Sequence, residues 1–162
     1  MGKLNNSQDS SFLKQRFLKS FTAKLSQADN EVRNYYKQLK AYILSYSKSN
    51  SRVSWHYDAI NVGNSQIAKF AIRGKTLCIY LALDNVDKKY KVEKATSFRF
   101  EETQMLYRIK NDKRCRYAKE LIDQIMKNVG SKKTSEVKDI LLPSYEDDET
   151  LLKKGLIKEM RG

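Results

Sequence analysis

The segment Thr76–Leu83 constrains the fold of this chain most, because it is an almost unbroken apolar run. A short run of this kind is typical of a central strand that is covered on both faces, or by helices on one face and a partner on the other. Arg73-Gly74-Lys75 precedes the run as a tight turn, in which Gly74 can adopt the positive φ that such turns need. Gln66–Ile72, just before this turn, is predicted to be a neighbouring strand.

Alternating apolar and polar residues predict further strands on both sides of this pair. In Ser51–Tyr57 and in Thr103–Lys110, apolar side chains recur at every second position and therefore point to one side. Tyr90–Val92 is predicted to be a short strand. The segments Asn61–Asn64 and Asp84–Lys89 are predicted to be loops, the first because of its glycine and asparagines and the second because of its charge.

Two segments have the period of an amphipathic helix. The first lies between Ser26, a candidate cap, and Ser47, and we expect its helix over Asp29–Ser47. Its apolar stripe comprises Val32, Tyr35, Tyr36, Leu39, Tyr42, Ile43 and Tyr46. We interpret these tyrosines as core rather than as a platform for stacking bases. The second helix is predicted over Asp112–Val129, capped by Asn111 or Asp112 and closed by Gly130.

These elements predict an α+β domain, in which a mainly antiparallel, curved sheet of four or five short strands packs against two principal helices. The expected core comprises Tyr35, Tyr36, Leu39, Ile43, Trp55, Leu77, Ile79, Leu81, Leu121, Ile122 and Ile125. We expect a basic N-terminal arm (1–25), the α+β domain (26–130) and a charge-balanced tail (131–162). The tail contains a predicted short helix over Glu146–Lys154, whose leucines would either pack back on the domain or dock on a partner.

The composition excludes several classes of protein. The chain has 162 residues, of which 40% are hydrophobic, which fits one globular domain and excludes a disordered chain. No apolar run approaches the roughly 20 residues that cross a bilayer, and the first residues do not resemble a signal peptide. Cys78 and Cys115 are too few for a disulfide framework. We therefore expect a protein of a bacterial-type cytosol, with no membrane partner.

The residues that usually carry chemistry predict no catalytic site. One histidine and two distant cysteines do not have the spacing of a structural zinc site. Asp58 and Lys69 lie near predicted strands, but no second carboxylate precedes Lys69, as a metal-dependent nuclease would require. Cys78 lies in the most apolar strand and Cys115 on the buried stripe of its helix, where thiols are usually inert. We expect no enzyme activity, no metal and no cofactor.

The positive charge suggests an anionic partner. The net charge of +13 is confined to residues 1–130, because basic and acidic residues cancel in residues 131–162. Basic residues cluster over 110–119, where a predicted strand leads into a helix N-terminus, which itself attracts phosphate. Basic residues of other strands would extend this patch if those strands are neighbours. The predicted nucleic-acid-binding residues are Arg52, Arg73, Lys75, Arg108, Lys110, Lys113, Arg114 and Arg116. The alternative is a solvated basic surface.

Four stretches also resemble a known family: Phe21–Leu25, Ser51–Trp55, Arg73–Leu83, and Lys110–Arg114 continuing through Tyr117–Ile122. They are similar to an uncharacterised domain that recurs in bacterial cytosolic proteins, sometimes in several copies or beside zinc-ribbon segments. The strand–helix half also resembles, more weakly, a domain of unknown function that is attached to restriction-type nucleases and labelled a predicted transport protein. The resemblance implies a nucleic-acid context by analogy. It brings no established activity and no catalytic residues, and this chain has no zinc ribbon.

The sequence therefore predicts a small non-enzymatic module that binds nucleic acid, either RNA or DNA, largely without sequence specificity. The alternative is a protein-interaction adaptor that docks on a partner, or on a second copy, through Glu146–Lys154. A third class, an enzyme or small-ligand domain, would require a pocket with convergent polar groups.

Overall fold

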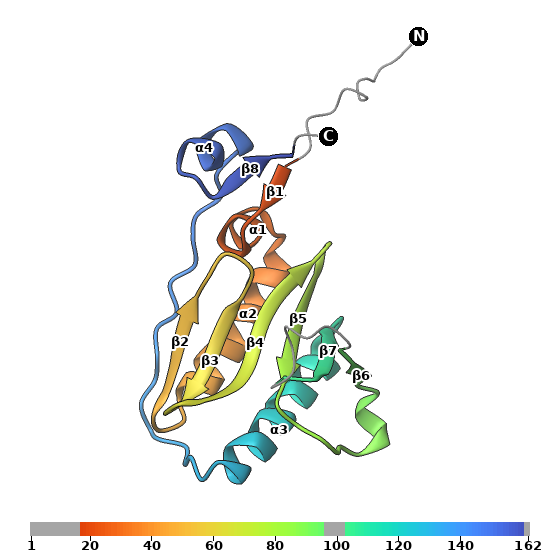
Figure 1. Cartoon of the computed structure of the whole chain (residues 1–162). Helices are drawn as coiled ribbons and strands as arrows, with labels where there is room; N and C mark the ends of the chain where they lie inside the picture. The colour runs from red at the N-terminus through yellow and green to blue at the C-terminus, as the bar shows by residue number, and fades with distance from the viewer. Residues whose placement is uncertain (1–16, 96–102, 161–162) are drawn as a thin grey trace.

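The computed structural model describes residues 17–95 and 103–160. These residues form an α+β fold with a six-stranded antiparallel sheet, a separate two-stranded sheet and four α-helices (Figure 1). The elements are β1 (Phe17–Lys19), α1 (Phe21–Gln27), α2 (Asn30–Leu44), β2 (Ser49–Val53), β3 (Asp58–Val62), β4 (Ser65–Arg73), β5 (Thr76–Leu81), the 3₁₀ helix η1 (Lys88–Tyr90), β6 (Glu93–Lys94), β7 (Met105–Ile109), α3 (Asp112–Asn128), α4 (Asp148–Lys153) and β8 (Ile157–Glu159).

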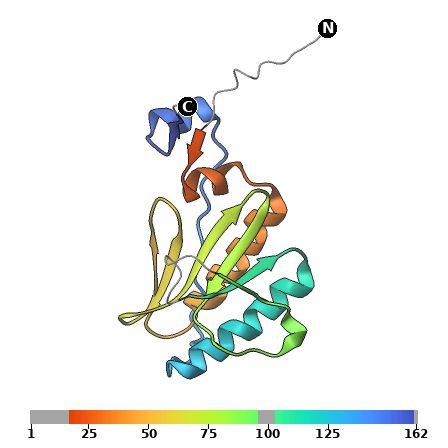
Figure 2. The same ribbon diagram turned by 45° about the vertical axis from the view of Figure 1, so that its right-hand side comes forward.

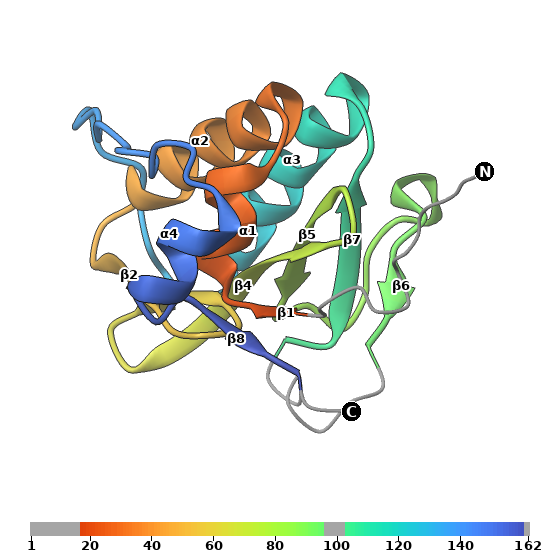
Figure 3. The ribbon, with the colours of Figure 1, turned by 90° about the horizontal axis from the view of Figure 1, so that it is seen from above.

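The hairpin of β4 and β5 lies at the centre of the main sheet, whose strand order is β2-β3-β4-β5-β7-β6. The predicted turn is confirmed, since Arg73 pairs with Thr76 and Gly74 has a φ of 62°. Helices α2 and α3 cover one face of this sheet (Figure 3). Residues directly opposite each other across strands share a face, so the buried row of Phe70, Ile79 and Tyr107 lies on one face. The neighbouring row of Ala71, Cys78 and Arg108 lies on the other face.

The sheet differs from the prediction in strand number and shape, because it has six strands rather than four or five and is not curved. The additional strand is β3, since the chain turns at Ser54–Tyr57, where the Ser54 N–H donates to the Tyr57 carbonyl at 2.8 Å. The predicted strand Ser51–Tyr57 therefore ends at Val53. Curvature needs repeated bulges or glycine kinks, and the described strand pairs show one register shift, between Ile60 and Asn61.

The other element boundaries follow from local hydrogen bonds. Helix α2 begins after Asp29, whose carboxylate accepts from the Val32 N–H at 3.0 Å, and it ends at Leu44, three residues before the predicted end. Ser45 caps that end, and its carbonyl accepts from Thr134. The prediction of a strand over Tyr90–Val92 is wrong, because Tyr90 is the last residue of η1 and the next strand begins at Glu93.

Helix α3 matches its prediction closely at both ends. The Asn111 side chain accepts from the Arg114 N–H at 2.9 Å and so caps the N-terminus. Gly130 follows the C-terminal residues with a φ of 74°, and the Ser131 N–H donates to the Met126 carbonyl at 2.9 Å. This bond and the one from Gly130 to Lys127 form a Schellman motif. Helix α3 is therefore specified by residues adjacent to its own ends.

The main core fills the space between the sheet and helices α1, α2 and α3. Every residue of the predicted core is buried except Trp55, which is half-buried beneath the Lys158 ammonium. Residues 21–25, which the sequence assigned to an arm, begin α1, and the side chains of Phe21 and Leu25 belong to this core. The core of the domain therefore reaches further toward the N-terminus than residue 26.

The tail packs back on the domain, which is one of the two arrangements that the sequence predicted for its leucines. Leu151 and Ile157 form a small buried cluster with Ala23 of α1, and β8 pairs with β1. Figures 1 and 2 show α1, β1, α4 and β8 together at one end of the main sheet. The segment that leads to α4 is held by hydrogen bonds, among them one of 2.8 Å from the Arg33 guanidinium to the Pro143 carbonyl.

A pair of tyrosines joins the end of α2 to α3. Their hydrogen bonds make the stability of the fold depend on pH in the alkaline range. The hydroxyls of Tyr42 and Tyr46 both donate to the Asp123 carboxylate. Burial and this hydrogen bond raise the pKa of Tyr46 from 10.0 to about 12. A pKa that is raised on folding contributes stability that is complete below the unfolded value and is lost as the pH rises through the folded value.

We therefore expect Tyr46→Phe to lower the free energy of unfolding by about 1.5 kcal/mol at neutral pH. The difference between the variant and the wild type is expected to shrink as the pH rises from 10 toward 12. Urea denaturation followed by circular dichroism at several pH values measures it. A difference that stays constant up to pH 12 would contradict the assigned hydrogen bond.

Candidate nucleic-acid interface

Several basic side chains lie on the face of the main sheet that is turned away from α2 and α3, which we call the open face. Strand register places Arg52, Arg73 and Arg108 there, from β2, β4 and β7. Lys69 shares the face, because it lies opposite Ala59, which in turn pairs with Arg52. Register thus places these three arginines on one face of the sheet, and their role in binding stays a prediction.

The open face carries a hollow of about 480 Å³ between β4, β5, β7 and β6, which we call the open-face hollow. Its lining comprises Lys24, His56, Tyr57, Ala71, Ile72, Arg73, Tyr80, Glu93, Lys94, Ala95, Leu106 and Arg108. Among the described residues of this lining, four are Lys or Arg and one, Glu93, is an acid. The hollow therefore has a positive balance and attracts anions.

A second hollow of about 340 Å³ adjoins the first, and we call it the α1 hollow. Its lining comprises Lys19, Lys24, Gln27, Ala28, Asp29, Val32, Ile72, Gly74 and Lys75. Lys24 and Ile72 belong to both linings, so the two hollows meet there, where the Lys24 ammonium donates to the Ile72 carbonyl at 3.2 Å. We call the six basic residues of the two linings the basic track: Lys19, Lys24, Arg73, Lys75, Lys94 and Arg108.

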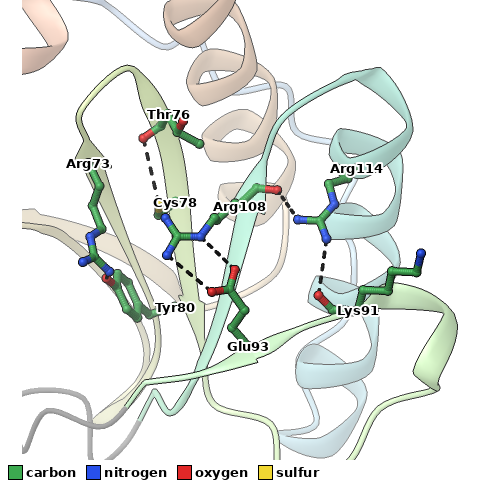
Figure 4. A network of polar contacts seen from close by, with 8 residues as sticks. All are labelled: Arg73, Thr76, Cys78, Tyr80, Lys91, Glu93, Arg108 and Arg114. Carbon is green, nitrogen blue, oxygen red and sulfur yellow. Dashed lines mark hydrogen bonds and ion pairs between the residues drawn. The ribbon is translucent and has the colours of Figure 1, made fainter.

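Two carboxylates and a neighbouring tyrosine orient parts of this track. The Arg108 guanidinium donates to Glu93 at 2.8 and 3.4 Å, across the pair of β7 and β6 (Figure 4). These hydrogen bonds lower the pKa of Glu93. Arg73 donates to the Tyr80 hydroxyl at 3.3 Å, and the Lys19 ammonium lies 3.4 Å from Asp148. Arg108 is thus partly neutralised within its hollow.

The predicted residues on α3 have a different setting. Arg114 donates to the carbonyls of Arg108, at 2.8 Å, and of Lys91, at 3.3 Å (Figure 4). Its guanidinium also stacks 4.6 Å from the centroid of the Tyr107 ring. Arg114 therefore ties the start of α3 to β7 and to the segment after η1, which is a structural role.

The structure divides the eight predicted site residues into two sets. Arg73, Lys75 and Arg108 belong to the basic track. Five others line neither hollow: Arg52, Lys110, Lys113, Arg114 and Arg116. Arg52 lies on β2, an edge strand of the sheet, and Lys110 lies between β7 and α3. The other three belong to α3, which packs on the opposite face of the sheet. Tertiary packing places Lys19, Lys24 and Lys94 in the track, and no residue pattern near them in the sequence predicts this.

The structure adds little support for other kinds of site. Within residues 17–95 and 103–160, no group of three or more His, Cys, Asp or Glu side chains is arranged to hold a metal ion. Cys78 and Cys115 are buried, which raises the pKa of both thiols. No helix in the described part of the chain is both long and apolar enough to span a membrane.

Comparison of the chain with models of protein families, with curated proteins and with solved structures found no significant match. The resemblance to the bacterial domain families and the cytosolic location therefore stay predictions.

Proposed function

We propose that this protein is a non-enzymatic module that binds nucleic acid, largely without sequence specificity, through the basic track. The observation that carries the proposal is the junction of two hollows at Lys24 and Ile72. In the part of the chain that the structure describes, their linings contain six basic residues and two acids, Asp29 and Glu93. A continuous row of cations suits a polymer of phosphates better than a single small anion, which one hollow alone would hold.

The geometry also supports the lack of sequence specificity. Arg73 and Lys75 are exposed on either side of Gly74, at the tip of the central hairpin, where their charges reach a phosphate backbone. Contacts of this kind position a nucleic acid but do not distinguish its bases. The alternative function, an adaptor that acts through Glu146–Lys154, stays a prediction, and Leu151 of that segment is already buried within this chain.

Fluorescence anisotropy with labelled RNA and DNA of mixed sequence tests the proposal, at about 50 and 200 mM salt. We expect binding at the lower salt concentration and a marked loss of affinity at the higher one, because counterions are released when cations neutralise phosphates. Affinities that differ little between unrelated sequences would support binding through the backbone. Absence of binding at the lower salt concentration would overturn the proposal.

A further inference from the structure

We infer that the tail restrains binding at the basic track, because the Asp148 carboxylate of the tail competes with nucleic acid for the Lys19 ammonium. This inference rests on the proposed function and concerns the regulation of the same site. It is carried by the place where the acidic start of α4 meets one end of the track.

A third hollow, of about 590 Å³, adjoins the α1 hollow. Lys19 and Gln27 belong to both linings. The third lining continues into the tail with Tyr145, Asp147, Asp148 and Glu149. The charge of the surface therefore changes sign at Lys19. A polyanion that lies along the track meets carboxylates of the tail beyond this residue, and these like charges repel it.

Asp148 contacts the track, whereas the acids beside it have partners within the tail. These partners are Lys154 for Glu146, Lys153 for Glu149 and the Thr150 N–H for Asp147. The Oδ1 atom of Asp148 instead accepts from the Gln27 side-chain amide at 2.8 Å and lies 3.4 Å from the Lys19 ammonium. The hydrogen bond from Gln27 and the charge of Lys19 lower the pKa of Asp148. The carboxylate is therefore charged at neutral pH.

Lys19 is accessible to a phosphate in spite of this contact. Its side chain is 33% exposed, and that of Asp148 is 46% exposed. The Lys19 ammonium also donates to the Gln27 Oε1 atom at 2.7 Å, which holds it where the two hollows meet. Exposed ion pairs are weak, so a phosphate can replace the carboxylate on Lys19 at a cost of up to about fivefold in affinity.

Other contacts hold the tail in place beside the track. Leu151 and Ile157 are buried against Ala23, and β8 pairs with β1. The Ser20 N–H donates to the Leu156 carbonyl at 3.0 Å. The competitor is therefore one side chain on an element that is docked independently of it. A substitution of this side chain tests the inference without removing the tail, whose loss would expose the buried cluster.

Asp148→Asn is the test variant, because asparagine keeps an oxygen that can accept from Gln27 but carries no charge. Anisotropy titrations with a labelled single strand measure its affinity over a range of salt concentrations. We expect the affinity at about 50 mM salt to rise about fivefold and the slope of log affinity against log salt to steepen by about 0.7, as one further phosphate contact would produce. Asp139→Asn is the matched control, because Asp139 is an exposed acid of the tail outside all three linings. It should change the affinity by less than about twofold.

A double-mutant cycle with Lys19→Gln provides a second measurement. In the wild type this substitution is expected to cost less than about twofold in affinity, since Asp148 already neutralises the ammonium. In the Asp148→Asn background it is expected to cost about fivefold, because the ammonium then contacts a phosphate. The same titrations measure all four proteins of the cycle.

The outcomes separate this inference from the proposed function. If Asp148→Asn binds like the wild type or like Asp139→Asn, the inference is overturned while binding by the track stands. Equal costs of Lys19→Gln in the two backgrounds would also overturn it. Faster amide hydrogen exchange at Ser20 in Asp148→Asn would overturn it as well, because the gain would then come from a detached tail rather than from one carboxylate. If neither the wild type nor any variant binds at low salt, the proposed function itself fails.

Discussion

Replacement of Asp58 by asparagine is expected to lower the free energy of unfolding by about 3 kcal/mol, because it removes the anion of a buried ion pair. The Asp58 side chain is completely buried, and its Oδ2 atom accepts from the Tyr36 hydroxyl at 2.5 Å and from the Lys40 ammonium at 2.9 Å. Its other oxygen accepts from the Ser51 hydroxyl. Urea denaturation followed by circular dichroism measures the loss.

Two further variants separate the charge of Asp58 from its hydrogen bonds. Ser51→Ala removes one hydroxyl donor and leaves the ion pair intact, so we expect a loss of about 1 kcal/mol. Lys40→Met removes the cation and leaves the carboxylate with its hydroxyl donors, which is expected to cost about as much as Asp58→Asn. A loss below about 1 kcal/mol for Asp58→Asn would show that the network does not stabilise the fold in this way.

The Asp58 network also shows why part of the fold is not visible in the sequence. An aspartate after a strand-like segment resembles a loop residue or a lone acid, and its neighbours in the chain give no sign of burial. Its partners Tyr36 and Lys40 lie on α2, about twenty residues earlier in the chain. A buried acid becomes acceptable only when such partners are packed against it.

Elements whose signals lie within a few residues were predictable. Gly74 at the tip of the central hairpin and the apolar run after it define β4 and β5 without reference to the rest of the chain. Asn111 and Gly130 likewise define both ends of α3. Backbone conformation and capping act over one turn, so the sequence carries this information locally.

Elements that depend on distant partners were not predictable in the same way. Strand β3 was missed because its inward side chains begin with Asp58 rather than with an apolar residue. The sheet of β1 and β8 joins segments at opposite ends of the described chain, and β6 has two residues. Pairing of such short strands is set by tertiary packing rather than by their own composition.

The residues of the candidate site also divide into those that local sequence predicts and those that distant contacts place. Arg73 and Lys75 flank a predicted turn, so their proximity followed from the hairpin alone. Arg108 joined them only because β7 pairs with β5 in a register that the sequence does not reveal. Lys24 joined the track because α1 packs near the end of β4, whereas the α3 residues lie on the face of the sheet opposite the open-face hollow. Charge clustering in the sequence therefore predicted only part of the basic track.

The basic track makes a quantitative prediction for a triple variant, Lys24→Gln with Arg73→Gln and Lys75→Gln. Each cation that contacts a phosphate contributes about 0.7 to the slope of log affinity against log salt for a single strand. We therefore expect the slope to fall by about 2 and the affinity at about 50 mM salt to fall on the order of 100-fold. All three side chains are exposed, so the fold should be retained. Anisotropy titrations over a range of salt concentrations measure both quantities.

A matched control separates the effect of where the positive charges lie from the effect of the total charge. The triple variant of Lys37, Lys88 and Lys127 to glutamine also removes three positive charges, but these exposed residues line neither hollow. It should lose far less affinity, because charges beyond a Debye length of about 10 Å are largely screened at 0.1 M salt. Equal losses in the two triple variants would mean that the overall charge, rather than the track, governs binding.

Removal of an acid from the open-face hollow is expected to strengthen binding, which is the opposite of the effect of the triple variant. Glu93→Gln removes the carboxylate that accepts from Arg108 at 2.8 Å and so makes this guanidinium available to a phosphate. We expect the affinity at about 50 mM salt to rise about fivefold, as one further phosphate contact would produce. Since the Glu93 side chain is half-exposed and its pair lies at the rim of the sheet, stability should change by less than about 1 kcal/mol. An unchanged affinity would show that Arg108 does not contact the bound nucleic acid.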